Sequence, residues 1–222
     1  MNLYQLLINI RKLIENMAYK NLLLRLFFSF IFVILYFSIV SIDFGLVYFL
    51  ILIIYIIIIL EVFFYFKKYR FIPLIYIFLS LGFFLTIDFN LDNFLFFNFY
   101  IFLNIIFDIF SYIIGKLFGK NKLIKISPKK TVEGLLGGFI FSLLLSLILA
   151  YIINLNIDFS LIIFSILIII CAFVGDIIES FFKRKNNLKD SSELIPGHGG
   201  VFDRFDSFLF SIIFFSISVN FL

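Results

Sequence analysis

The chain has 222 residues, of which 64% are hydrophobic and only 14% are charged, with a formal net charge of +4. Soluble domains are about half apolar, so a water-soluble fold could not bury this much apolar side-chain surface. The single cysteine, Cys171, also excludes a disulfide or a cysteine metal cluster within one chain.

Residues 1–20 carry apolar side chains at helical spacing with basic ones between them, which predicts an amphipathic helix in the membrane interface. No small-residue cleavage site precedes the next apolar run, so we expect no removable signal peptide. Later runs approach the roughly 20 apolar residues that cross a bilayer. They predict an all-α, polytopic membrane bundle of about seven transmembrane helices, at about 23–41, 44–66, 71–89, 93–114, 135–155, 159–179 and 205–222.

Lys and Arg fall on alternate connections between these spans, and the opposite connections have none. Cytoplasmic loops of membrane proteins are enriched in basic residues. The pattern therefore predicts a cytoplasmic N-terminus and one basic cytoplasmic face, with a bacterial inner membrane as the simplest location. The opposite connections instead contain Asp43, Asp88, Asp92 and Asp158.

The segment from Ser180 to Asp206 is strongly polar in an otherwise apolar chain. It combines basic side chains, carboxylates and the glycines Gly197, Gly199 and Gly200. Mg²⁺ takes one or two carboxylates together with phosphate oxygens, and Lys and Arg neutralise the remaining phosphate charge. Glycines let backbone N–H groups approach such oxygens closely. The segment is therefore predicted to bind a phosphate ligand through a divalent cation.

Two carboxylate pairs frame this segment. Asp176 and Glu179 end the sixth predicted span, and Asp203 and Asp206 begin the seventh. A spacing of three places each pair on one face of its helix. A carboxylate beside an apolar run is costly without a polar cavity or a partner, and a metal ion is one such partner. Together the two helix ends would form a carboxylate cluster within reach of a soluble nucleotide and a lipid head group.

Two motifs resemble those of a known family. Within the segment from Ser180 to Asp206, the pattern Ser-x-x-Lys-Arg, Lys-Asp, Pro-Gly-His-Gly-Gly and Asp-Arg-x-Asp resembles the hallmark of the phosphatidate cytidylyltransferases, also called CDP-diacylglycerol synthases. The block from Ser127 to Gly134 is similar to the Ser-Pro-Lys-Lys-Thr-x-Glu-Gly motif of that family, with Val132 where an aromatic residue is expected. The residues that lead into it match as well: Asp108, Tyr112, Gly115 and Gly119.

The resemblance implies transfer of the cytidylyl group of CTP to phosphatidate, giving CDP-diacylglycerol and pyrophosphate in phospholipid biosynthesis. It implies Mg²⁺, with or without a second cation, and it suggests a homodimer, with membrane lipid but no nucleic acid as a partner. We expect one membrane domain over residues 1–222, with N-terminal helices in 1–107 and the catalytic motifs in 108–210.

The same resemblance assigns roles to individual residues. The expected metal ligands are Asp176, Asp203 and Asp206, although Asp206 is equally well explained as a partner of Arg204 or a helix cap. The expected catalytic residues are Asp176, Asp203, Lys183, Arg184 and Arg204. The expected substrate-binding residues are Asp108, Ser127, Lys129, Lys130, Thr131, Lys189, Asp190, His198, Gly199 and Gly200.

Several of these residues also have plainer explanations. The carboxylates are alternatively helix-end charges or members of a salt bridge, and the basic residues are alternatively topology determinants. A phosphate monoester is already anionic at neutral pH, so His198 is expected to donate to a phosphate oxygen or to shape the loop rather than to act as a base. Glu61 and Asp108 lie in apolar spans and are functional candidates by default. Glu61 alternatively pairs with Arg25 or another basic group near the same surface.

Two other classes of function fit parts of the sequence. A CTP-dependent lipid-alcohol kinase of the polyprenol type would need a base for a neutral hydroxyl, and no dedicated one is evident. An ion-coupled transporter would use Glu61, Asp108 and Asp176 as an ion path, but it would leave the glycine-rich basic loop unexplained. Cytidylyl transfer is therefore the predicted function.

Overall fold

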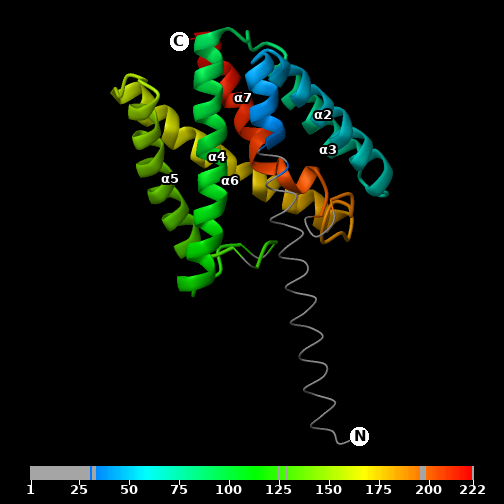
Figure 1. The fold of residues 1–222 in the computed structure, drawn as a ribbon. Coiled ribbons are helices and arrows are strands. Elements are labelled where there is room, and N and C mark those ends of the chain that lie inside the picture. The colour runs from blue at the N-terminus through cyan, green and yellow to red at the C-terminus, as the bar shows by residue number, and fades with distance from the viewer. Residues whose placement is uncertain (1–30, 32–33, 125, 129, 196–198, 222) are drawn as a thin grey trace, which may run out of the picture.

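The computed structural model describes residues 31, 34–124, 126–128, 130–195 and 199–221. Over these residues the chain is an all-helical bundle without a β-strand (Figure 1). The expected amphipathic helix at 1–20 and the first part of the span at 23–41 lie outside the described residues, and residues 34–42 are helical. The all-α prediction is confirmed for the described part of the chain.

Most helix ends coincide with the predicted spans to within a few residues, but α3 ends at Phe84 rather than near 89 and α6 continues to Lys185 rather than ending near 179. Among the described residues, four helices are long and apolar enough to cross a membrane, and α3 and α7 are shorter. The protein is therefore a polytopic membrane bundle. The elements are α2 (Leu46–Tyr65), α3 (Phe71–Phe84), α4 (Leu91–Phe118), α5 (Val132–Ile152), α6 (Phe159–Lys185), the 3₁₀ turn η1 (Phe202–Arg204) and α7 (Asp206–Phe221).

Side-chain caps begin three of the long helices. The side chains of Asn90, Thr131 and Asp158 accept hydrogen bonds from backbone N–H groups in the first turns of α4, α5 and α6, respectively. Such a cap satisfies an N–H group that has no partner within the helix and contributes about 1 kcal/mol. These polar residues therefore mark the points where the apolar helices start.

Helix α7 packs against α3, α4 and α6. In Figure 1, α4 and α5 lie side by side, α6 crosses behind α4 at an oblique angle, and α2 and α3 lie on the other side. Aromatic rings join the central elements: the ring of Tyr100 on α4 lies 4.8 Å from that of Phe215 on α7, and Phe164 on α6 lies 6.2 Å from Phe215. The buried Tyr100 hydroxyl donates to the backbone oxygen of Phe208 at 3.0 Å. This core holds α4, α6 and α7 together.

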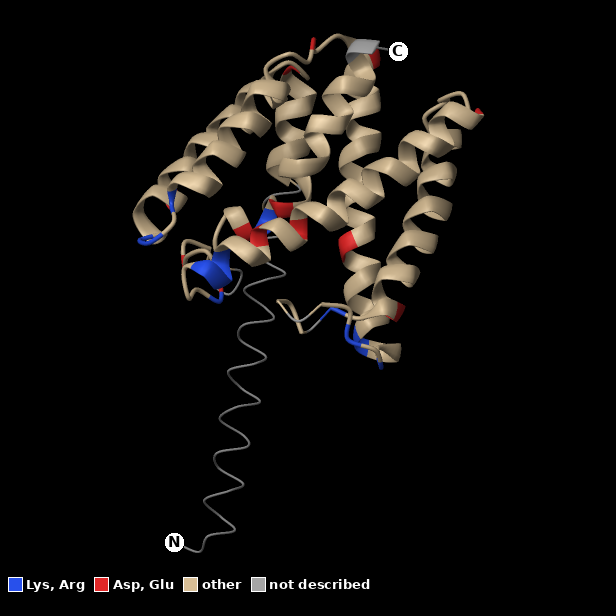
Figure 2. Cartoon of the chain, turned by 180° about the vertical axis from the view of Figure 1, so that it is seen from behind, with Lys and Arg blue, Asp and Glu red and all other residues tan. Residues whose placement is uncertain are grey.

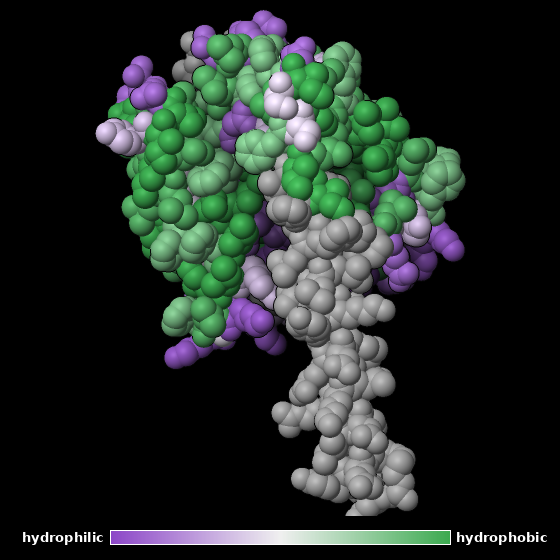
Figure 3. All heavy atoms as spheres, viewed as in Figure 1, coloured by the Kyte–Doolittle hydropathy of each residue, from purple (hydrophilic) through white to green (hydrophobic). Residues whose placement is uncertain are grey.

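Charge and hydropathy are distributed as expected for a membrane protein. Figure 3 shows a mostly hydrophobic face, with hydrophilic residues gathered toward its ends. In Figure 2, Lys and Arg lie toward one end of the bundle, where the α2–α3, α4–α5 and α6–α7 connections are. The opposite end carries acidic residues only among the described charged ones.

Helix α6 is longer than the predicted span. The sequence predicts a polar loop from Ser180, whereas the helix continues to Lys185. Phe182 is buried in the bundle, and Lys183 forms an ion pair with Glu179 one turn earlier. The last turn is basic, which suits the negative end of the helix dipole. The end of α6 therefore carries part of the polar motif on a rigid helix.

Close packing of α4 on α5 depends on glycine. A Cβ atom on Gly137 would lie 2.3 Å from Cδ1 and 2.9 Å from Cβ of Ile114. We expect Gly137→Ala to lower the stability of the bundle by about 1–3 kcal/mol, because Ile114 has to move. Gly82→Ala on α3 is the matched control, since nothing lies within 4 Å of its added Cβ. Thermal unfolding in detergent measures both, and equal midpoints for the two variants would contradict the prediction.

Candidate active site

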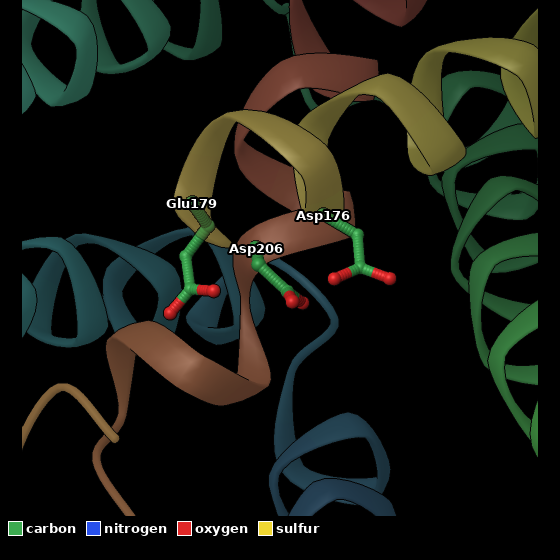
Figure 4. Close-up of side chains that lie close together, drawn as sticks. All are labelled: Asp176, Glu179 and Asp206. Atoms are coloured by element: carbon green, nitrogen blue, oxygen red, sulfur yellow. The ribbon is translucent and has the colours of Figure 1, made fainter. Parts of the chain in front are cut away.

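Three carboxylates meet where α6 crosses the start of α7. Asp176 and Glu179 come from α6 and Asp206 from α7, and each offers an oxygen within 4.8 Å of the others (Figure 4). We call these three residues the carboxylate cluster. Glu179 is fully buried, whereas Asp176 and Asp206 are half-buried. The cluster is a candidate site for a cation.

The crossing of α6 and α7 is unusually close at this point because residue 175 is glycine. A Cβ atom on Gly175 would lie 2.5 Å from the backbone oxygen of Asp206 and 3.0 Å from Cβ of Phe210. The absence of a side chain therefore lets the turn that carries Asp206 approach the turn that carries Asp176. The spacing of three residues along α6 then adds Glu179 on the same face.

Lys183 joins the cluster to the loop before α7. Its Nζ lies 2.7 Å from Oε2 of Glu179 and 2.7 Å from Oδ1 of Asp203. The other Asp203 oxygen, Oδ2, accepts hydrogen bonds from the backbone N–H groups of Ser191 and Gly200, both at 2.9 Å. Burial raises the pKa of Asp203, but the ammonium group of Lys183 and the hydrogen bond from Gly200 N–H outweigh burial and lower the pKa to about 2. Asp203 therefore stays ionised.

Asp203 is thus held by Lys183 and the loop backbone, while Glu179 lies with Asp176 and Asp206. The sequence pairs Glu179 with Asp176 by spacing but offers no reason to prefer it to Asp203 as a ligand. Because helix α6 continues beyond residue 179, Lys183 lies between the carboxylates of Glu179 and Asp203. The sequence alone does not show this arrangement. The assignment of Asp203 to the metal stays a prediction.

The upstream motif reaches the same site through Lys130 and Asp108. The ammonium group of Lys130 forms an ion pair with Asp176, and it lies 5.6 Å from the ring centroid of Phe173. On α4, Asp108 accepts a hydrogen bond from the hydroxyl of Ser207, the residue after Asp206, at 3.1 Å. The two motifs, far apart in sequence, are therefore neighbours in the fold.

Other residues predicted for the site have structural contacts instead of reaching the cluster. The side chain of Thr131 caps α5 by accepting from Gly134 N–H at 3.1 Å, and the backbone oxygen of Ser127 accepts from Lys130 N–H at 3.0 Å. The guanidinium of Arg184 donates to the backbone oxygens of Ile126 and Leu188, so it joins the end of α6 to the upstream loop.

The remaining predicted residues lie in the loop between α6 and α7 or outside the described part. Lys189, Asp190 and Arg204 are exposed. Gly199 has a φ of 84°, a left-handed conformation that favours glycine, and its N-terminal neighbours are not described. Lys129 and His198 lie outside the described residues.

Sequence reasoning missed the contacts of Glu61. This carboxylate on α2 is 2% exposed, and it accepts hydrogen bonds from the hydroxyl of Ser191 and the backbone N–H groups of Val201 and Phe202. Arg25, the partner expected from the sequence, lies outside the described residues. The only signal in the sequence is a glutamate in an apolar run.

The electrostatics of the site favour a cation. The cluster and Asp108 together bring four carboxylates into mutual repulsion, and the described cations that act on them are Lys130, Lys183 and Arg204. A divalent cation in the cluster would relieve that repulsion and would leave coordination positions for oxygens of a phosphate ligand. The geometry thus suits chemistry on a polyphosphate at one end of a membrane bundle.

Comparison with known proteins agrees with this chemistry. Residues 7–222 match the Cytidylyltransferase family. The phosphatidate cytidylyltransferases of Staphylococcus haemolyticus and Staphylococcus saprophyticus are 45% and 48% identical to the chain over 102 residues. The protein of the same name from Staphylococcus aureus strain COL is 44% identical over 103 residues. Each alignment covers 45% of this chain and 39% of the relative, so the similarity spans less than half the length of these curated relatives.

Proposed function

The chain belongs to the cytidylyltransferase family, and on this premise we propose that it transfers the cytidylyl group of CTP to phosphatidate. The products are CDP-diacylglycerol and pyrophosphate. The observation that carries the proposal is the carboxylate cluster beside Lys130 and Lys183 at the basic end of an apolar bundle. The names of the bacterial relatives support phosphatidate as the acceptor.

The residues of the cluster fit Mg²⁺ as the cofactor. Mg²⁺ takes hard oxygen ligands and leaves room for substrate phosphates, and Asp176, Glu179 and Asp206 offer oxygens within 4.8 Å of one another. These three residues would hold the ion, with Asp203 as a further candidate beside Glu179. Bound there, Mg²⁺ would neutralise charge on the triphosphate and stabilise the leaving pyrophosphate.

The protein groups supply positioning and charge in this reaction. A phosphate oxygen of phosphatidate attacks the α-phosphorus of CTP, and the bond from that phosphorus to the β-phosphate oxygen breaks. Because the attacking phosphate is already an anion at neutral pH, no protein base is required. Lys130 and Lys183 provide positive charge next to the cluster, and the exposed Arg204 lies at the loop edge, where a phosphate can reach it.

The two substrates approach from different phases. CTP comes from water, and phosphatidate comes laterally through the bilayer, so the site has to lie at one membrane face. The gathering of Lys and Arg at the end of the bundle that carries the site supports a cytoplasmic site, with the N-terminus on the same side, in a bacterial inner membrane. The homodimer rests on the family resemblance alone.

One assay tests the proposed function. Purified protein in detergent is given labelled CTP and Mg²⁺ with phosphatidate, with diacylglycerol as a matched lipid that lacks the phosphate, or with a polyprenol. We expect pyrophosphate release and CDP-lipid formation with phosphatidate only, and loss of both when EDTA removes the metal. Release of CDP with the polyprenol would identify a lipid-alcohol kinase, and ion transport in liposomes without CTP turnover would identify a transporter.

A further inference from the structure

Glu61 is a buried carboxylate whose three hydrogen-bond donors all come from one distant segment. Its Oε1 accepts from the hydroxyl of Ser191, and its Oε2 accepts from the N–H groups of Val201 at 2.8 Å and Phe202 at 3.1 Å. The donors lie at least 130 positions away along the chain. A glutamate in the apolar helix α2 therefore serves as an acceptor for the loop between α6 and α7.

The two N–H groups belong to the start of η1. The first N–H groups of a helical turn have no partner within the turn, so Glu61 acts as their cap. The capped turn carries Asp203, which contacts Lys183, and the exposed Arg204. The orientation of η1 relative to the carboxylate cluster thus depends on a residue of α2.

The loop is closed at its base by two carboxylates. Glu61 holds the side chain of Ser191, and Asp203 holds the N–H groups of Ser191 and Gly200 at 2.9 Å each. Within the loop, Ile195 N–H donates to the backbone oxygen of Gly199 at 2.8 Å. Both ends of the segment between Ser191 and Gly200 are therefore fixed next to Asp203.

Gly200 shows independently how tightly Glu61 and Ser191 pack against the loop. A Cβ atom on Gly200 would lie 1.8 Å from Oε1 of Glu61 and 2.1 Å from Oγ of Ser191. Any side chain there would separate Glu61 from the loop. The glycine therefore makes room for the carboxylate of α2.

We propose that Glu61 is a positioning residue for the proposed reaction. It holds Ser191 and the turn from Val201 to Arg204 in the arrangement that keeps Asp203 on Lys183 and places Arg204 beside the substrate phosphates. This inference rests on the proposed function only for the identity of the substrate. When the hydrogen bonds of Glu61 are lost, a smaller fraction of molecules has the loop in the arrangement that binds CTP. The apparent affinity for CTP falls in proportion to that fraction.

Three variants test this role through the kinetics. Glu61→Ala removes all three contacts, and we expect KM for CTP to rise by about tenfold or more. Glu61→Gln keeps the length: its oxygen accepts from Val201 and Phe202, and its amide donates to Ser191, so its KM should lie nearer to the wild-type value. Tyr55→Phe is the matched control, because it removes a buried hydrogen bond of the same helix, to Ser80, away from the loop. A KM in Glu61→Ala within about twofold of wild type would overturn the proposal.

Hydrogen–deuterium exchange provides a readout that does not depend on any reaction. We expect the amides of Val201 and Phe202 to exchange about tenfold faster or more in Glu61→Ala than in wild type and in Tyr55→Phe. Unchanged exchange would overturn the proposed role of Glu61 even if the enzyme is active. Conversely, a wild-type protein that forms no CDP-lipid would contradict the proposed function. The exchange experiment would still show whether Glu61 holds the turn that begins at Val201.

One further variant covers the case in which Glu61→Ala does not fold. Ser191→Ala removes only the donor to Oε1 and leaves the N–H groups of Val201 and Phe202 on Oε2. We expect it to raise KM for CTP and to speed exchange of the Val201 and Phe202 amides relative to Tyr55→Phe. A KM and exchange rates equal to those of Tyr55→Phe would overturn the proposal.

Discussion

Replacing Asp206 with asparagine is expected to lower kcat for cytidylyl transfer by more than about 100-fold, since residues that merely support metal ligands already cost 10–100-fold in metal affinity or activity. The carboxylate of Asp206 is the contribution of α7 to the cluster. Asparagine has the same shape and still accepts a hydrogen bond at a helix start, so a capping role would be preserved. The substitution therefore separates metal binding from a capping role, and the dependence on Mg²⁺ separates it from a charge contact with Arg204.

The measurement is a titration of activity with Mg²⁺ in the wild type and the variant. We expect the Mg²⁺ concentration for half-maximal activity to rise as kcat falls. Asp158→Asn is the matched control, because Asp158 stands at the start of α6 as a cap and does not belong to the cluster. If Asp206→Asn behaves like Asp158→Asn, Asp206 does not bind the metal.

Replacing Lys183 with methionine is expected to destabilise the protein by about 3–5 kcal/mol, because removal of one partner leaves buried charges without compensation. The side chain of Lys183 is 13% exposed and lies between Glu179 and Asp203, which are 0% and 5% exposed. Methionine keeps the apolar stem, so the lost charge is the main change. Activity should fall as well, because Asp203 loses the partner that fixes it.

Thermal unfolding followed by far-UV circular dichroism measures this effect, since the chain contains no tryptophan for fluorescence. Lys185→Met is the control from the same helix turn: Lys185 is exposed, and its change should stay within about 0.5 kcal/mol. Adding Asp203→Asn to Lys183→Met removes one uncompensated charge and should restore part of the stability. If the Lys183→Met protein is as stable as the Lys185→Met protein, the buried ion pairs of Lys183 with Glu179 and Asp203 do not stabilise the fold.

The membrane helices were predictable because hydropathy alone decides where they lie. The boundaries of helices α2 to α7 agree with those of the predicted spans within a few residues in most cases. A boundary lies where polar side chains interrupt the apolar run, as Asn90 and Asp158 do at the starts of α4 and α6. The end of α6 was not predictable in this way. Ser180 and Lys183 read as loop residues, yet burial of Phe182 and the contact between Lys183 and Glu179 continue the helix.

That carboxylates of the two helix ends lie close together was predictable, but which of them form the cluster was not. The spacing of Asp176 and Glu179 indicates one helix face, and the glycine-rich segment indicates phosphate chemistry. Which carboxylate Lys183 neutralises depends on how α6 and α7 cross at Gly175, a tertiary contact without local signal. The contact of Glu61 with Ser191 joins residues 130 positions apart, and no periodicity or spacing reports it.

The shortness of α3 has a mechanical consequence for the surrounding bilayer. Its 14 residues rise about 21 Å, whereas the hydrocarbon layer is about 30 Å thick. The helix faces outward, with Phe71 and Ile75 more than half exposed, so lipids beside it have to compress or tilt, at a cost of fractions of a kcal/mol per ångström. Asn186 at the end of α6 accepts hydrogen bonds from the N–H groups of Lys68 and Tyr69, just before α3. The thinner patch of bilayer beside α3 would therefore adjoin the helix that carries the carboxylate cluster. A lipid in that patch would carry its head group nearer to the bilayer centre, on the side where the proposed phosphatidate site lies.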